Sequence, residues 1–330
     1  MGVELANRKK TSEWAKYKNR KRIQRRYKFY TPRTIDRRSR INLWAPSIFS
    51  IIESREKVIA YFKDVFDHSK RGDYVVMNMG KIIKTDALTV SLVIAIMMDS
   101  RRSNVDSFVK HVKVVVPTGN SQPAEVFKKS HFRDTVTTHN ANQNYFMSRT
   151  DMAINTKYTG EIIDFAESRG VSDAKTILNP LLVEIFSNTN NHASLYEEKV
   201  PWFLSIMDDG EMLCFSVIDL GIGIYESLRT SRAIRKIPQK EFNIIDNMYD
   251  NRQSKYLSYQ IPRGVYSSTK EACRGKGLKE IYEKANNSTT CKRFVIISNK
   301  AMVDLLNINK IQDDSGFSFD GTAFYWEMEK

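Results

Sequence analysis

The sequence predicts an α+β protein with two folded parts and a basic N-terminal arm, and three observations lead to this fold class. Positive charge is concentrated at the start of the chain. A strand, a helix and a second strand alternate within residues 46–118, and strands mixed with a few long helices fill residues 161–330. With 330 residues and 41% hydrophobic content, the chain is long enough for each part to bury its own core.

Residues 1–45 form the basic arm. They contain 15 Lys and Arg residues against three acidic ones, which accounts for +12 of the net charge of +14. Aromatic residues such as Trp14 and Tyr27 are interleaved with the charges, a composition that suits phosphate neutralisation and stacking on bases. Two interpretations stay open: sequence-blind binding of nucleic acid, and a solvated tail that aids solubility.

The composition excludes several classes of protein. The longest apolar-rich segment, residues 88–98, is too short to span a bilayer. The N-terminus lacks the apolar segment of a secretory signal, and Ala6 stands where a myristoylation motif has Ser or Thr. Cys214, Cys273 and Cys291 are too widely spaced for a CxxC pair. We therefore expect a soluble cytoplasmic protein without a zinc site and without a membrane anchor.

The first folded part, residues 46–118, is expected to be an α/β unit, with a sheet covered by helices. Its predicted elements are helices at 54–67 and 86–100 and strands at 74–79 and 112–116. Residues 119–160, which are rich in Asn, Gln, Thr and Ser, are predicted to be a connector with local strands.

The second folded part, residues 161–330, combines long helices with strands, which indicates an α+β sandwich. Its predicted elements are helices at 161–168, 174–194 and 279–285 and strands at 202–207, 212–219, 293–298 and 322–328. Asp209-Gly210, a dipeptide favoured in tight turns, joins the first two of these strands into a predicted hairpin.

Three polar residues, Glu184, Asn188 and His192, recur every four residues on the predicted helix 174–194 and therefore share one face. The carboxylate could orient a water molecule, and the amide oxygen of Asn188 could hold a hard cation. Taken alone, the same stripe is more typical of a solvated helix face than of a site.

A glycine motif, Asp219-Leu-Gly221-Ile-Gly223, directly follows a predicted strand. Its glycines allow a sharp turn and close approach to a ligand, and Asp219 can accept a hydrogen bond from an amino group. Taken alone, the motif is also compatible with an ordinary strand-to-loop turn.

A second glycine-rich segment, Arg274-Gly275-Lys276-Gly277-Leu278, opens a predicted helix. The exposed N–H groups of a helix N-terminus favour anions, and Lys276 adds a positive charge for phosphate. The GxxxxGK[ST] motif of P-loop enzymes is absent from the chain. Finally, Asp320-Gly321-Thr322 leads into the last predicted strand.

ExxxN on a helix, DxGxG after a strand, GxGL before a helix and GT before a final strand occur here in the order that defines the GHKL superfamily of gyrase, heat-shock chaperone, histidine kinase and MutL ATPases. Residues 161–330 resemble this family. The resemblance implies the GHKL (Bergerat) α/β sandwich, with a mixed sheet under helices, and binding of ATP with Mg²⁺. It also implies an ATP lid at about residues 224–274.

The resemblance further implies a role for each motif residue. Glu184 would be the general base, Asn188 the magnesium ligand, and Asp219 the partner of the adenine amino group. The wall residues would be Gly221 and Gly223, the phosphate-binding segment Arg274, Gly275, Lys276, Gly277 and Leu278, and the adenine-side residue Thr322. His192 matches a histidine of the kinase-like branch, where its role is less sharply defined.

Residues 46–118 more loosely resemble STAS domains, the partner-binding modules that anti-sigma kinases phosphorylate in bacteria. The match consists of the strand 74–79, the segment Thr85-Asp86-Ala87-Leu88 and the long apolar helix that follows. In that family a phosphorylatable serine follows the aspartate, where this chain has Ala87. Thr85, Thr89 and Ser91 are the remaining candidates.

Three functions stay open as alternatives. The first is an ATPase or ATP-dependent switch that acts through the STAS-like part on a protein partner, and the second is an anti-sigma-type protein Ser/Thr kinase. The third is a nucleotide-regulated protein that binds nucleic acid through residues 1–45. By analogy, a chain of this make-up is expected in bacterial stress or phage defence, and a homodimer is compatible with the family.

If the arm binds nucleic acid, the affinity should fall about 10³-fold or more between about 50 and 200 mM salt, because each neutralised phosphate releases counterions. Removal of the arm should abolish both the binding and its salt dependence. Fluorescence anisotropy with a labelled duplex of arbitrary sequence measures both quantities, and binding that survives the deletion would contradict the role of the arm.

Overall fold

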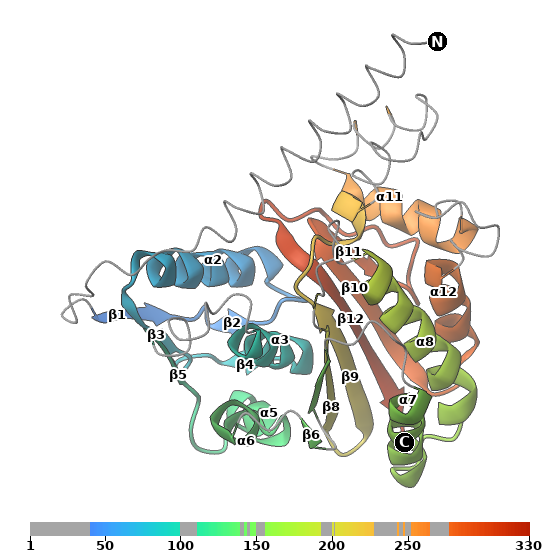
Figure 1. Ribbon diagram of the computed structural model, residues 1–330, viewed down its shortest axis with the longest axis horizontal. Coiled ribbons are helices and arrows are strands. Elements are labelled where there is room, and N and C mark those ends of the chain that lie inside the picture. Colours follow the sequence, from blue (N-terminus) through green and yellow to red (C-terminus); the bar gives the residue numbers. More distant parts are fainter. Residues whose placement is uncertain are drawn as a thin grey trace, which may run out of the picture.

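The computed structural model describes residues 40–99, 111–138, 142–143, 146–149, 156–192, 200, 202–227, 243, 247, 252–264 and 277–330. Within these residues the chain has the predicted α+β class. A small parallel sheet and its helices come first in the chain and lie against one face of a large sheet. Further helices cover the opposite face of the large sheet (Figure 1).

The N-terminal part contains the four elements that the sequence predicts between residues 54 and 116, and three further strands. Its sheet has the order β1-β3-β5 and is parallel. The elements are β1 (Arg40–Trp44), β2 (Ile48–Phe49), α2 (Arg55–Arg71), β3 (Tyr74–Asn78), β4 (Lys84–Thr85), α3 (Ala87–Met98) and β5 (Val112–Val115). Since β1 lies inside the predicted arm, a deletion that tests the arm should end before Arg40.

The predicted connector contains more regular structure than its composition indicates. Residues 119–160 hold two helices and two strands, together with the start of a third helix. These are α5 (Gln122–Lys129), α6 (Phe132–Thr138), β6 (Asn142–Gln143), β7 (Phe146–Arg149) and α7 (Thr156–Ser168). Helix α5 forms because Val126 and Phe127 are buried and because Ser121 caps its N-terminus, where its hydroxyl accepts a hydrogen bond from the backbone N–H of Ala124.

The C-terminal part is a seven-stranded sheet of order β11-β10-β12-β9-β8-β7-β6. Its remaining strands are β8 (Trp202–Asp208), β9 (Met212–Asp219), β10 (Cys291–Asn299), β11 (Ala301–Asp304) and β12 (Phe319–Glu329). Its remaining helices are α8 (Ala174–His192), α11 (Gln253–Gln260), the 3-10 turn η1 (Ile261–Arg263) and α12 (Gly277–Asn287).

The expectation of a mixed sheet is wrong for the strands that the structure describes, because all their pairings in this sheet are antiparallel. Strands β9 and β10 run in the same direction, but the last strand of the chain, β12, is inserted between them and is antiparallel to both. The predicted hairpin of β8 and β9 is confirmed.

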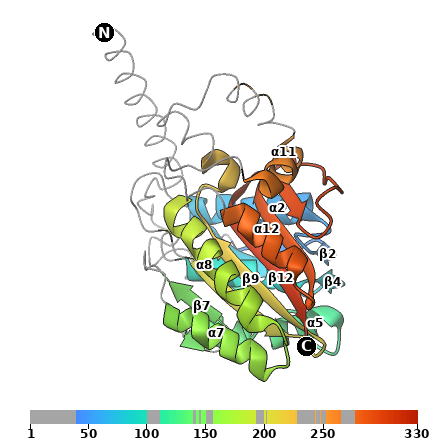
Figure 2. The same ribbon diagram turned by 90° about the vertical axis from the view of Figure 1, so that its right-hand side faces the viewer.

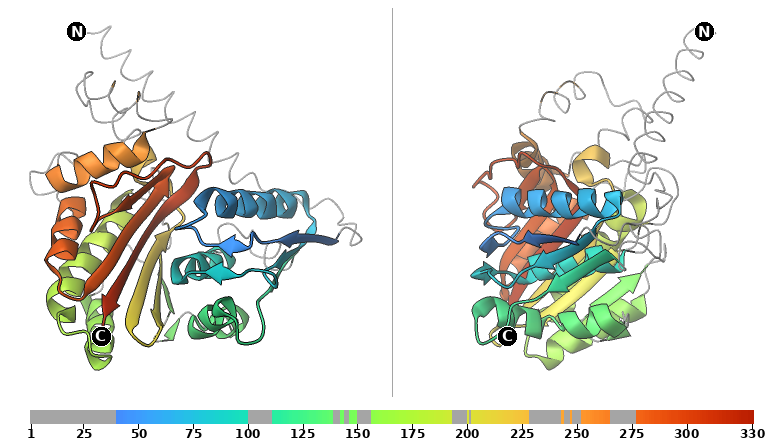
Figure 3. Two further views of the ribbon diagram at one scale, coloured as in Figure 1. Left: turned by 180° about the vertical axis from the view of Figure 1, so that it is seen from behind. Right: turned by 90° about the vertical axis from the view of Figure 1, so that its left-hand side faces the viewer.

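Both faces of the large sheet are buried, since successive side chains of a strand point to opposite faces. Along β9, Phe215 and Val217 pack under the helices, whereas Cys214 and Ile218 pack with the N-terminal part. Helices α7, α8 and α12 therefore cover one face (Figure 2), and α3 of the N-terminal part covers the other (Figure 3). The two parts that the sequence predicts share one hydrophobic core.

Among the residues that the structure describes, no helix is both long enough and apolar enough to cross a membrane. Cys214 and Cys291 are buried free thiols, and burial raises the pKa of each to about 12. Cys273 lies outside the described residues.

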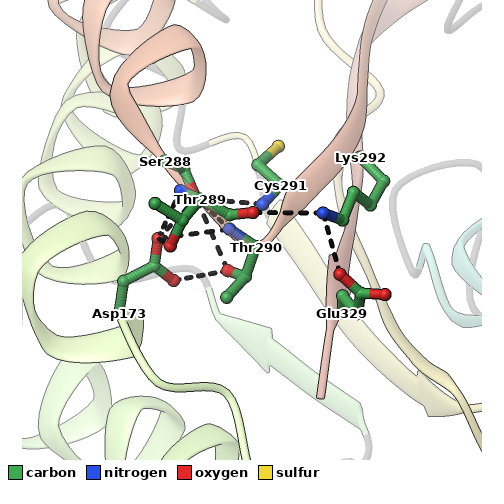
Figure 4. Close-up of polar contacts among 7 residues, drawn as sticks. All are labelled: Asp173, Ser288, Thr289, Thr290, Cys291, Lys292 and Glu329. Atoms are coloured by element: carbon green, nitrogen blue, oxygen red, sulfur yellow. Dashed lines mark hydrogen bonds and ion pairs between the residues drawn. The ribbon is translucent and has the colours of Figure 1, made fainter.

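Asp173, which directly precedes α8, joins that helix to the turn between α12 and β10 (Figure 4). Its carboxylate accepts hydrogen bonds from the hydroxyl of Ser288 at 2.7 Å, from the backbone N–H of Thr289 at 2.9 Å and from the hydroxyl of Thr290. Burial of the Asp173 carboxyl raises its pKa, but the hydrogen bonds outweigh burial, so that the pKa is lowered overall.

Replacement of Asp173 by Ala should lower the free energy of unfolding by about 1–2 kcal/mol at pH 7, because hydrogen bonds to a charged group are lost. A carboxyl whose pKa is lowered on folding stabilises the protein above its unfolded pKa of about 3.8, and this stabilisation is lost as the pH falls through the folded value. The difference between wild type and Asp173→Ala should therefore shrink as the pH falls below about 4.

Urea denaturation at pH 7 and at acidic pH measures this difference. Glu167→Ala, which removes an exposed carboxylate from α7, is the control and should change little. A difference between wild type and Asp173→Ala that is independent of pH would contradict the role of the carboxylate.

Candidate functional site

Two motifs that are distant in the sequence meet where α12 begins. Glu184 and Asn188 lie one turn apart on α8, and Gly277, the first residue of α12, lies directly against both. A Cβ atom at Gly277 would stand 2.5 Å from Oε2 of Glu184 and 3.3 Å from Nδ2 of Asn188. The first of these distances is shorter than real Cβ contacts, so the glycine is what allows the carboxylate its position.

The environment of Glu184 makes its carboxylate a stronger proton acceptor. Burial raises the pKa of this half-buried group, and the negative charge of Glu280 in the first turn of α12 raises it further. A carboxylate with a raised pKa is suited to general-base chemistry.

Asn188 carries an amide that the described part of the chain leaves unsatisfied. Its Nδ2 atom is buried and has no hydrogen-bond partner among the described residues. Since an unpaired buried donor is unfavourable, this amide is suited to a ligand: its nitrogen can donate to an anion, and its oxygen can bind a hard cation once the amide is turned. His192 is the last residue of α8, and its side chain lies outside what the structure describes.

Asp219 and the Gly-Thr motif are neighbours on adjacent strands. Asp219 is the last residue of β9, is almost fully buried, and accepts a hydrogen bond on Oδ1 from the backbone N–H of Gly221 at 3.0 Å. Thr322 of β12, also buried, is its partner in the sheet register. A Cβ atom at Gly321 would stand 2.1 Å from the carbonyl oxygen of Asp219, so the strands could not pair in this way with a larger residue.

The loop after Asp219 is held by residues that sequence analysis missed. Gly223 has a φ of +80°, and its missing Cβ leaves room for the side chain of Asn299. Ser298 and Asn299 end β10 and donate to or accept from the backbone of residues 222–226. No sequence signal marks this pair, because an Asn after a strand indicates a turn but not its distant partner.

Glu184 and Asn188 lie at the same end of the sandwich as Asp219 and Thr322. At the opposite end, Asp173 at the start of α8 is bonded to the turn after α12, and the N–H of Glu329 in β12 donates to the carbonyl of Thr290. The last half of α8, the start of α12, the end of β9 and the start of β12 therefore lie at one end of the sandwich (Figures 1 and 2).

The structure describes only part of the predicted phosphate-binding segment. Gly277 and Leu278 begin α12, where Leu278 packs against the helix-side core, whereas Arg274, Gly275 and Lys276 lie outside the described residues. The predicted lid, residues 224–274, is described at residues 224–227, 243, 247 and 252–264, where α11 is packed against β11 with Tyr256 and Leu257 buried.

No protein-family model matches the chain, and no curated protein matches it. Within the described residues, no three His, Cys, Asp or Glu side chains are grouped so as to hold a metal ion. The chemistry that the site can perform thus follows from Glu184, Asn188, Asp219 and their neighbours.

Replacement of Gly321 by Ala should be strongly destabilising, because the new Cβ would meet backbone that cannot move aside. Gly210 is the matched control: its φ of +109° also disfavours Ala, but nothing lies within 4 Å of a Cβ there. We expect Gly210→Ala to cost about 1–2 kcal/mol through its backbone conformation and Gly321→Ala to cost about 1–3 kcal/mol more. Equal losses in chemical denaturation would contradict the close approach of β12 to Asp219.

Proposed function

We propose that the chain binds ATP with Mg²⁺ at this end of the sandwich and hydrolyses it, as a GHKL-type ATPase. We further propose that the nucleotide acts as a switch on the N-terminal part, through which a protein partner is engaged. The observation that carries the proposal is the contact of Gly277 with both Glu184 and Asn188, at the end of the sandwich that also holds Asp219 and Thr322.

The residues fit the proposed ligand at three points. The buried Asn188 amide without a partner among the described residues suits a phosphate oxygen or Mg²⁺. Gly277 begins an 11-residue helix, whose N-terminal N–H groups favour phosphate. Asp219, with a carboxylate at the end of a buried strand, would accept a hydrogen bond from the adenine amino group.

In the proposed reaction, Glu184 takes a proton from a water molecule. The oxygen of that water bonds to the terminal phosphorus as the bond between this phosphorus and the leaving ADP oxygen breaks. The raised pKa of Glu184 favours this proton transfer. Mg²⁺, when bound, would neutralise negative charge on the phosphate oxygens.

The N-terminal part supports the switch rather than the kinase alternative. Thr85, Thr89 and Ser91, the three candidate phosphate acceptors, are all buried. The hydroxyl of Thr85 donates to the carbonyl of Phe49, and that of Thr89 donates to the carboxylate of Asp86. The hydroxyl of Ser91 donates to the carbonyl of Ala87. Such hydroxyls could reach a nucleotide only if the domain opened, so transfer of phosphate to them is disfavoured.

The packing of α3 against β9 offers a route for the switch. The hydroxyl of Ser216 in β9 donates to Ser91 in α3 at 2.9 Å, and both side chains are buried between the two parts. Asp219 ends the same strand three residues later. A displacement of β9 on nucleotide binding would therefore also shift α3, which packs against this strand.

ATP labelled on its terminal phosphate tests the proposal. Wild type with Mg²⁺ should release the label as free phosphate. Glu184→Ala should lower the turnover rate about 10²- to 10⁴-fold, because the general base is lost, and should keep the affinity for ATP. The control is Glu167→Ala, which removes an exposed carboxylate of α7 and should turn over like wild type.

Two results would contradict parts of this proposal. Unchanged turnover in Glu184→Ala would refute its role as the base. Label retained on the protein would instead support the Ser/Thr kinase alternative, and mapping the labelled residue would locate the acceptor.

A further inference from the structure

The amide of Asn299 holds the loop that follows Asp219. Its Oδ1 accepts hydrogen bonds from the backbone N–H groups of Tyr225 at 3.1 Å and Glu226 at 3.2 Å, and its Nδ2 donates to the carbonyl of Ile222 at 2.8 Å. Asn299 is buried, so these bonds are shielded from water. One side chain thus fixes the backbone on both sides of Gly223.

Gly223 is the complement of this amide. A Cβ atom at Gly223 would stand 2.6 Å from both Oδ1 and Nδ2 of Asn299, and the φ of Gly223 is +80°. Asn299 itself has a φ of +53°, a conformation that Asn tolerates better than most residues. The second glycine of the DxGxG motif therefore makes room for Asn299, rather than for the ligand that the motif alone predicts.

Ser298 ties the same loop to the Gly-Thr motif. Its hydroxyl accepts a hydrogen bond from the backbone N–H of Ile224 at 2.7 Å and donates to the carbonyl of Gly321 at 3.0 Å. It also lies 3.2 Å from the hydroxyl of Thr322. The end of β10 therefore links the two motifs that flank Asp219.

The turn after Asn299 is itself held in place. The backbone N–H of Lys300 donates to Oε1 of Gln253 at 2.9 Å, and that of Met302 donates to the hydroxyl of Ser254 at 3.1 Å. Both acceptor side chains lie in the first turn of α11 and are buried. The backbone that follows Asn299 is therefore held by α11. This keeps the amide of Asn299 in place against the loop after Asp219.

We propose that Asn299, with Ser298, is a positioning residue of the nucleotide site. Together they hold the backbone of residues 222–226, and through it the turn after Asp219, in the shape that presents the Asp219 carboxylate to the amino group of adenine. The inference rests on the proposed function. It predicts that the amide of Asn299 governs the preference for adenine, although Asn299 acts through the loop rather than on the ligand.

The test compares ATP with GTP, since guanine carries a carbonyl oxygen where adenine carries its amino group. Calorimetric titration of the full chain with each Mg²⁺-nucleotide gives two Kd values and their ratio. Asn299→Gly removes the amide without opposing the positive φ, and should weaken ATP binding about tenfold or more, or about 1.4 kcal/mol, with a smaller effect on GTP. Asn299→Asp keeps the acceptor oxygen but loses the donor to Ile222, and should lie between Asn299→Gly and wild type.

The control is Asp173→Ala, which breaks hydrogen bonds at the other end of β10 and should lower stability while leaving the ratio of the two Kd values unchanged. If Asn299→Gly does not fold, Ser298→Ala removes a single hydroxyl and should lower the preference for ATP about threefold.

The outcomes separate this inference from the proposed function. Wild type that binds no Mg²⁺-ATP would overturn both. Wild type that prefers ATP, with a preference unchanged in Asn299→Gly or in its substitute Ser298→Ala, would overturn the positioning role alone.

Discussion

The close approach of backbone at three glycines is the constraint on which the candidate site depends. Gly277 admits the carboxylate of Glu184, Gly223 admits the amide of Asn299, and Gly321 admits the carbonyl of Asp219. At Gly277 and Gly321 a Cβ atom would overlap a group of another motif, and at Gly223 it would overlap the amide of Asn299, which lies outside the four motifs. The ExxxN and GxGL motifs are therefore fitted to one another, as are the DxGxG and GT motifs, and Ser298 and Asn299 hold the loop of the DxGxG motif.

A sheet buried on both faces carries this arrangement. The β9 residues Phe215 and Val217 lie in the helix-side core, and Cys214 and Ile218 lie in the core shared with the N-terminal part. The strand that ends at Asp219 is thus packed on both faces. This packing restricts the position of the Asp219 carboxylate. Because the same strand contacts α3 through Ser216, the candidate site and the N-terminal part are mechanically connected.

Much of this fold could be predicted from local pattern, and the rest depends on distant partners. Helix α8 and the hairpin of β8 and β9 follow from apolar periodicity and from Asp209-Gly210, and the structure confirms them. The sequence did not predict helix α5, because polar residues surround it, and it did not predict β1, because this strand lies within the charged arm. The order of motifs predicted Glu184, Asn188 and Asp219 as site residues, but nothing near Asn299 in sequence reveals that it faces Gly223.

Calorimetric titration of ATP into wild type and Asp219→Asn, each with and without Mg²⁺, decides whether this end of the sandwich is a nucleotide site organised by Asp219. Wild type should bind one ATP per chain with Mg²⁺ and should bind it more weakly without Mg²⁺. Asp219→Asn, which keeps the size of the side chain but removes the carboxylate, should lose most of the affinity. Absence of binding to wild type, or equal binding by both proteins, would contradict a nucleotide site organised by Asp219.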